Sequence, residues 1–90
     1  MQFNQIIEAV RKTGRKYGAK ELVLFGSRAT GYETEKSDID LAVSGVYDFE
    51  KMKEEIEEIP TLLSFDIVNL DTCKNELLIK EIRTNGCKIL

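Results

Sequence analysis

Three segments of the chain have apolar residues at helical spacing, with polar residues between them. Their apolar positions are Phe3, Ile6, Ile7 and Val10 in the first, Phe49, Met52, Ile56 and Ile59 in the second, and Leu78, Ile79 and Ile82 in the third. This pattern predicts three amphipathic helices. Pro60 limits the second, because proline cannot continue a helix from its interior.

Other segments have the patterns of strands. The run 22–25 is apolar at every position and stops at Gly26, which favours a buried strand. Residues 38–43 alternate strictly, and residues 65–70 place Phe65 and Ile67 opposite Asp66 and Val68. The ending 88–90 (KIL) is short, and we expect it to form a terminal edge strand.

The order of these elements predicts the fold class. Helices and strands alternate in a short chain, which indicates an α/β (α+β) fold with a small mixed β-sheet and helices packed on one face. Between the first two strands, a short helix is predicted over 27–30 with Ser27 as its N-cap, followed by a polar loop over 31–36. We expect one domain spanning residues 1–90, since this length suits a single core.

Composition narrows the function classes. The net charge is −3, with 13 Lys and Arg against 16 Asp and Glu, which argues against direct nucleic-acid binding. The absence of histidine excludes Ser-His-Asp triads and His-ligated zinc within this chain. Cys73 and Cys87 have no CxxC spacing, and two free thiols are favoured over a disulfide. With no signal peptide or membrane-span pattern, we expect a soluble cytoplasmic protein.

Three aspartates are the candidate catalytic and metal-binding residues. Asp38 and Asp40 lie two positions apart in a strand, so their side chains leave the same face about 6–7 Å apart. Carboxylates this close repel each other, and Mg²⁺ is their natural partner because it prefers oxygen ligands and often uses only one or two carboxylates plus phosphates. If the strand carrying Asp66 is the neighbour, three carboxylates converge, which suits two-metal phosphoryl transfer.

A glycine–serine turn is the candidate phosphate-binding element. Gly26 directly follows a buried strand, permits a tight turn and lets a phosphate approach the backbone. Ser27 adds a hydroxyl group, and Arg28 adds a permanent positive charge. One loop therefore supplies phosphate donors, while the following strand supplies metal ligands.

These residues together resemble a known family. The stretches 26–31 (GSRATG) and 37–41 (SDIDL) resemble the signature of minimal nucleotidyltransferases in the polymerase-beta-like superfamily, and 65–68 (FDIV) resembles the strand with that family's third acid. The resemblance covers nearly the whole chain and therefore implies the polymerase-beta-like nucleotidyltransferase fold. The C-terminal helical domain of larger relatives has no counterpart here.

The resemblance also implies an activity and a partner. Members are often the antitoxin of a pair whose toxin is a HEPN-domain ribonuclease, which implies transfer of AMP from ATP to a toxin tyrosine. By the same resemblance, Gly26 and Ser27 bind the triphosphate, Asp38 and Asp40 hold both Mg²⁺ ions, and Asp66 binds one ion and helps deprotonate the attacking hydroxyl. No membrane partner is expected.

Several alternatives stay open. Arg28 is equally well interpreted as a surface ion-pair partner of Glu33 or Glu35. Asp48 and Asp71 are better explained as cap or loop acids, and Tyr32 and Tyr47 as packing or loop residues than as base-stacking groups. For the whole chain, the rivals are a non-catalytic module that masks a toxin, and an adenylyltransferase that modifies a small molecule.

Overall fold

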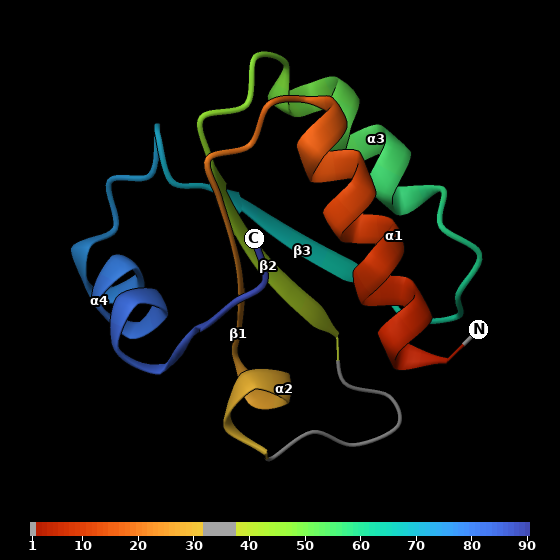
Figure 1. Ribbon diagram of the computed structural model, residues 1–90. Coiled ribbons are helices and arrows are strands. Elements are labelled where there is room, and N and C mark those ends of the chain that lie inside the picture. Colours follow the sequence, from red (N-terminus) through yellow and green to blue (C-terminus); the bar gives the residue numbers. More distant parts are fainter. Residues whose placement is uncertain (1, 32–37) are drawn as a thin grey trace.

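The computed structural model describes residues 2–31 and 38–90. Its elements follow the predicted order (Figure 1): α1 (Phe3–Lys16), β1 (Glu21–Phe25), α2 (Ser27–Thr30), β2 (Ile39–Ser44), α3 (Phe49–Glu57), β3 (Phe65–Asn69), α4 (Glu76–Asn85) and β4 (Cys87–Lys88). The predicted polar loop falls largely on 32–37, outside the described residues. No described helix is both long and apolar enough to cross a membrane.

The strands form one mixed sheet in the order β3-β2-β1-β4. Strand β1 pairs antiparallel with β2 and β4, whereas β2 and β3 are parallel. The terminal strand is therefore at an edge, as predicted, although its two residues are Cys87 and Lys88. The antiparallel pairing brings the end of β1 beside the start of β2, and the parallel pairing brings the start of β3 to the same end of the sheet.

The main core lies between α1, α3 and one face of the sheet. Its buried side chains come from alternate strand positions and from the apolar stripes of both helices: Ile6, Ile7, Val10, Tyr17, Leu22, Leu24, Ile39, Leu41, Val43, Met52, Ile56 and Ile67. Among them, the positions predicted to face inward by the helical spacing and by the alternation of 38–43 are Ile6, Ile7, Val10, Met52, Ile56, Ile39, Leu41 and Val43. The α/β class and the small mixed sheet are confirmed.

Helix α4 corrects one detail of the predicted architecture. It lies on the face of the sheet opposite α1 and α3, so helices cover both faces rather than one (Figure 1). Ile82 of α4 packs in a second buried cluster with Val23, Phe25 and Ala42. The reason lies in β1, which is apolar at successive positions. Such a strand places apolar side chains on both faces of the sheet, so both faces must be covered.

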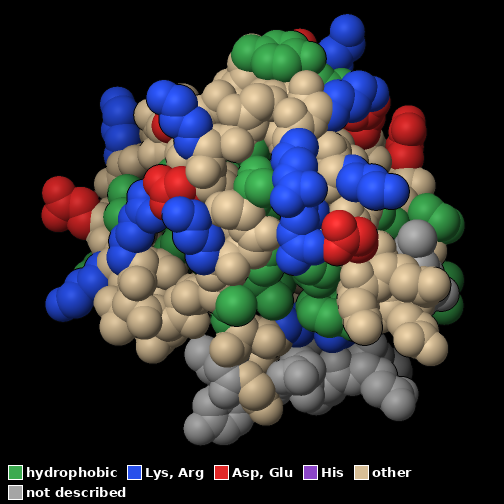
Figure 2. All heavy atoms as spheres, in the orientation of Figure 1, with side chains coloured by type: hydrophobic (Ala, Val, Ile, Leu, Met, Phe, Trp, Pro, Cys, Tyr) green, Lys and Arg blue, Asp and Glu red, His purple; other side chains and the backbone are tan. Residues whose placement is uncertain are grey.

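Glu21 and Arg83 form an ion pair that ties α4 to β1. Arg83 donates to both Glu21 carboxylate oxygens, one of them at 3.3 Å, and the Ser44 hydroxyl donates to the same carboxylate at 3.3 Å. Figure 2 shows basic and acidic side chains lying next to each other on this view of the surface. The hydrogen bonds from Arg83, helped by its charge and by Ser44, lower the pKa of Glu21 below its usual 4.5.

This lowered pKa makes the stability of the fold depend on pH. Because the folded-state pKa lies below the unfolded value, the contribution is complete above pH 4.5 and is lost as the pH falls through the folded pKa. We expect Glu21→Gln to lower the free energy of unfolding at pH 7 by about 0.5–1 kcal/mol, as for a partly exposed ion pair. Urea denaturation at pH 7 and at steps below pH 4.5 measures this. The difference from wild type should shrink in acid, whereas an equal loss at every pH would contradict the assignment. Glu57→Gln, at an exposed position of α3, is the control.

Candidate functional site

Two of the three predicted acids lie side by side on the sheet. Asp40 is the second residue of β2 and Asp66 the second of β3, and the parallel register pairs them directly. Ile39, Leu41 and Ile67 face the main core, so Asp40 and Asp66 point to the opposite face. Neighbouring strands are about 4.8 Å apart, which places the two carboxylates within reach of one ligand. The sequence left the pairing of these two strands as a condition, and the structure meets that condition.

Asp38 adds a third negative charge at the same end of the sheet. It lies just before β2 and is exposed, as is Asp66, whereas Asp40 is half-buried. Burial raises the pKa of Asp40 first, and the negative charges of Asp66 and then Asp38 raise it further. The three carboxylates therefore lie close enough to repel one another, and this repulsion is what a bound cation relieves.

The adjacent carboxylates of Asp40 and Asp66 fit Mg²⁺, provided that other oxygen atoms complete the coordination shell. Over residues 2–31 and 38–90, no three Asp, Glu or Cys side chains form a group that could hold a metal ion by themselves. Mg²⁺ often takes only one or two carboxylates and completes its shell with water and substrate phosphates. Asp40 and Asp66 meet that requirement, and the metal-binding roles of Asp38, Asp40 and Asp66 stay predictions.

Gly26 touches the Asp40 carboxylate. The antiparallel register sets Phe25 opposite Asp40, so the next residue turns directly over the acid. Gly26 has φ +76° and ψ −155°, a conformation that glycine alone adopts readily. A Cβ atom at this position would lie 2.2 Å from Asp40 Oδ2. The turn at Gly26 therefore packs directly against β2. Glycine is required here both for its backbone conformation and for the lack of space for a Cβ atom.

The short helix α2 begins at Ser27, as predicted, but the N-cap residue is Gly26 rather than Ser27. The Ala29 backbone N–H donates to the Gly26 carbonyl at 3.1 Å, which closes the single turn. Gly31 ends α2 in the left-handed conformation with φ +83°. Gly26 and Ser27 thus lie at the acid end of the sheet, and their contact with a triphosphate stays a prediction.

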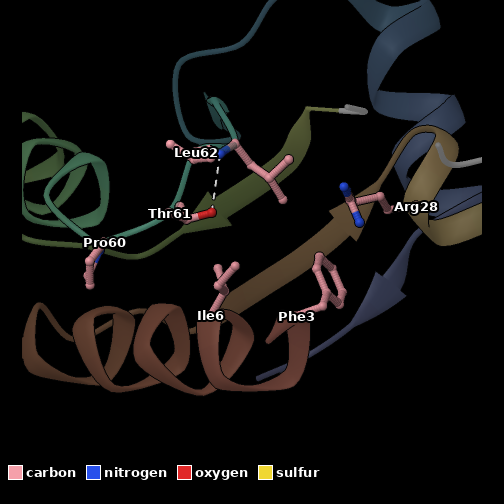
Figure 3. A pocket seen from close by; sticks show the side chains of 7 residues that line it. Phe3, Ile6, Arg28, Pro60, Thr61 and Leu62 are labelled. Carbon is pink, nitrogen blue, oxygen red and sulfur yellow. Dashed lines mark hydrogen bonds between the residues drawn. The ribbon is translucent and has the colours of Figure 1, made fainter. Parts of the chain in front are cut away.

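Arg28 is directed toward α1 rather than across the acid-bearing face. Its Cζ atom lies 4.8 Å from the centre of the Phe3 ring, within cation–π range (Figure 3). Both residues line a cavity of about 470 Å³ whose other lining residues are Ile6, Pro60, Thr61, Leu62 and Leu63. Phe3 and Ile6 belong to the α1 side of the sheet, whereas Asp40 and Asp66 face the other side.

Neither this cavity nor the contact between Phe3 and Arg28 is evident from the sequence. Phe3 lies on the apolar stripe of α1, and that pattern indicates only a core residue. Nothing in the local pattern connects it with Arg28, because the two residues come together only when α2 folds beside the start of α1. The predicted contact between Arg28 and the triphosphate is not tested by this arrangement. Glu33 and Glu35, its alternative partners, lie outside the described residues.

The remaining candidates have structural partners. Asp48 caps α3 by accepting from the Lys51 backbone N–H at 3.1 Å, and Asp71 accepts from the Gly45 N–H at 2.8 Å. Both were predicted to be cap or loop acids, and that is confirmed. Tyr47 packs on Tyr17 with ring centres 5.3 Å apart.

Cys73 and Cys87 are free, as expected. Tyr32 and Ser37, which the sequence analysis also considered, lie outside the described residues.

The family model described as polymerase beta, nucleotidyltransferase matches residues 4–90. No curated protein matches.

Three similar solved structures are of toxin–antitoxin proteins. One is the toxin–antitoxin MntA-HpeT with two aspartate-to-glutamate substitutions (23% identity, 100% of this chain and 73% of that chain, TM-score 0.71). A second is a toxin–antitoxin with AMP-PNP (23%, 93% and 72%, TM-score 0.74). A third is MntA-HpeT with a tyrosine-to-alanine substitution (27%, 98% and 71%, TM-score 0.67). These similarities show a shared fold.

Proposed function

The chain belongs to the polymerase beta family of nucleotidyltransferases, and from this premise we propose that it is an antitoxin that transfers AMP from ATP to its toxin. The acceptor in this proposal is a hydroxyl group, most simply a tyrosine, of a HEPN-domain ribonuclease encoded beside it. Two similar structures are of MntA-HpeT and another is of a toxin–antitoxin with AMP-PNP, an ATP analogue, which supports a toxin partner and ATP as the donor. We place this activity in the cytoplasm.

The observation that carries the proposal is the contact of three parts at one end of the sheet. Asp40 pairs with Asp66, and Gly26 packs on the Asp40 carboxylate. A triphosphate held by the Gly26–Ser27 turn would therefore lie beside the two carboxylates.

The reaction balances with the groups of this chain. The acceptor oxygen forms a bond to the α-phosphorus of ATP, the bond from that phosphorus to the bridging oxygen breaks, and diphosphate leaves. In this proposal Asp66, which is exposed, helps to deprotonate the hydroxyl group by accepting its proton. Asp38 and Asp40 would hold both Mg²⁺ ions, and Asp66 would also bind one of them. Mg²⁺, when bound, offsets the carboxylate charges and stabilises the charge that develops on the phosphates.

Intact-mass spectrometry tests the proposal directly. The chain is incubated with ATP, Mg²⁺ and the protein encoded by the neighbouring gene, and we expect that protein to gain the mass of at least one AMP unit. A reaction with Asp38→Ala and Asp40→Ala together is the control and should give no gain. An unmodified partner, under conditions where the two proteins form a complex, would contradict the proposal.

The same double variant separates catalysis from simple masking. If a chain lacking both carboxylates still neutralises the toxin, the antitoxin acts as a binding module and the acids are dispensable. Modification of a free small molecule in place of the partner protein would instead favour the small-molecule adenylyltransferase.

A further inference from the structure

Phe3 contacts Arg28 of α2 from the α1 side, close to the Gly26–Ser27 turn that is proposed to bind the triphosphate. We propose that Phe3 is a positioning residue for the nucleotide, which acts by stacking its ring against the Arg28 guanidinium and so fixing α2 with its Gly26–Ser27 turn. This inference rests on the proposed function for its nucleotide part. It assigns a role to a residue outside the motifs of the sequence.

Helix α2 needs such support because it is too short to be stable alone. It has four residues, and a single helical turn does not compensate the entropy of forming it. Contacts of Ala29 and Arg28 connect it to the α1 side of the fold. Ala29 is partly buried against the main core, and Arg28 stacks on the Phe3 ring at 4.8 Å.

The Phe3 ring is itself held firmly enough to serve as a support. The backbone N–H of Gln2 donates to Gln5 Oε1 at 2.9 Å, and the Gln5 N–H donates to the Gln2 carbonyl at 3.0 Å, so the first turn of α1 is closed. Phe3 is half-buried and packs against the main core. Figure 3 shows its ring rising from α1 toward the guanidinium of Arg28.

A displacement of α2 would be transmitted to the acids. Gly26 precedes α2 directly and lies in contact with the Asp40 carboxylate, so α2 cannot tilt without changing that contact. Reacting groups must be held to within a fraction of an ångström for efficient transfer. A continuous series of contacts therefore runs from α1 to the acid pair, through Phe3, Arg28, Gly26 and Asp40.

A rival role for the same contact predicts the opposite sign. In this rival role, Arg28 contacts Phe3 only in the absence of nucleotide and moves to the phosphates when nucleotide binds. Removing the ring would then favour the second position of Arg28 and tighten nucleotide binding. If Phe3 is a support, removing the ring weakens binding. The direction of the change therefore decides between them.

The test uses three variants of the full chain. Phe3→Leu keeps an apolar side chain but removes the ring, Phe3→Tyr keeps the ring, and Ile7→Val makes a small change to the same helix away from Arg28. Titration calorimetry with Mg²⁺ and a non-hydrolysable ATP analogue measures nucleotide affinity. Hydrogen exchange of a peptide covering residues 26–31, without nucleotide, measures the order of α2 independently.

We expect Phe3→Leu to weaken analogue binding by about three- to five-fold, the range of a half-exposed cation–π contact, and to speed exchange over 26–31. Phe3→Tyr and Ile7→Val should resemble wild type in both measurements. Unchanged or tighter binding by Phe3→Leu, unchanged exchange over 26–31, or equal weakening by Phe3→Tyr overturns the inference. If wild type binds no analogue but Phe3→Leu still speeds exchange, the support by Phe3 stands and the proposed function fails.

Discussion

Replacing Asp40 by asparagine should reduce nucleotidyl transfer by about 10²–10³-fold, as expected for losing one charged group that stabilises the transition state. Asp40 is the half-buried member of the carboxylate pair and the one that touches Gly26. An amide there removes the negative charge that is proposed to hold Mg²⁺ and keeps the shape of the side chain. The measurement is the rate of AMP transfer to the partner protein at saturating ATP and Mg²⁺.

The same variant should be no less stable than the wild-type protein. A neutral amide removes the repulsion that Asp40 experiences from Asp66 and Asp38, so the free energy of unfolding should stay constant or rise. Asp48→Asn is the matched control, because asparagine also caps helices well and Asp48 lies at the start of α3. It should leave transfer unchanged. Wild-type transfer by the Asp40→Asn chain would remove Asp40 from the mechanism.

Gly26→Ala is expected to impair both activity and stability. The methyl group would lie 2.2 Å from Asp40 Oδ2, so the carboxylate must move, and such a displacement can cost about 10²-fold in rate. The backbone conformation at φ +76° and ψ −155° adds a strain of about 1–3 kcal/mol in the free energy of unfolding. Transfer kinetics and urea denaturation of the same preparation measure the two effects.

Gly18→Ala separates strain from the collision. Gly18 also has a positive φ of +77°, but a Cβ there would meet only Tyr47 Cδ1 at 3.8 Å, an ordinary contact. This variant should lose stability and keep its transfer rate. If Gly26→Ala transfers AMP as fast as Gly18→Ala, the contact between Gly26 and Asp40 has no catalytic importance.

The elements and the acids were predictable from sequence because their signals are local. Alternation over 38–43 fixed which side chains of β2 share a face, and the structure puts Asp40 opposite Leu41 as that alternation required. The apolar stripes of α1 and α3 likewise identified the residues that are buried. The family signature then connected the glycine turn with the acids.

The relations between elements were not predictable in the same way. Pairing of β2 with β3 could only be assumed, since the sequence does not state which strands are neighbours, and a shift of one residue would have turned Asp66 to the other face. The side of the sheet covered by α4 depends on Val23, Phe25 and Ala42 as a group. Arg28 lies over the ring of Phe3, a residue that is distant in sequence.

Helix α4 sets a lower limit on how far this protein could be shortened. All three acids and the glycine turn precede residue 67, so a fragment ending before Glu76 would keep every group assigned to chemistry. It would also lose Ile82 and Leu78, which cover Val23, Phe25 and Ala42 on the very face that bears Asp40. Without α4, these apolar side chains would be exposed to solvent beside the carboxylates, and we expect such fragments to aggregate instead of being active.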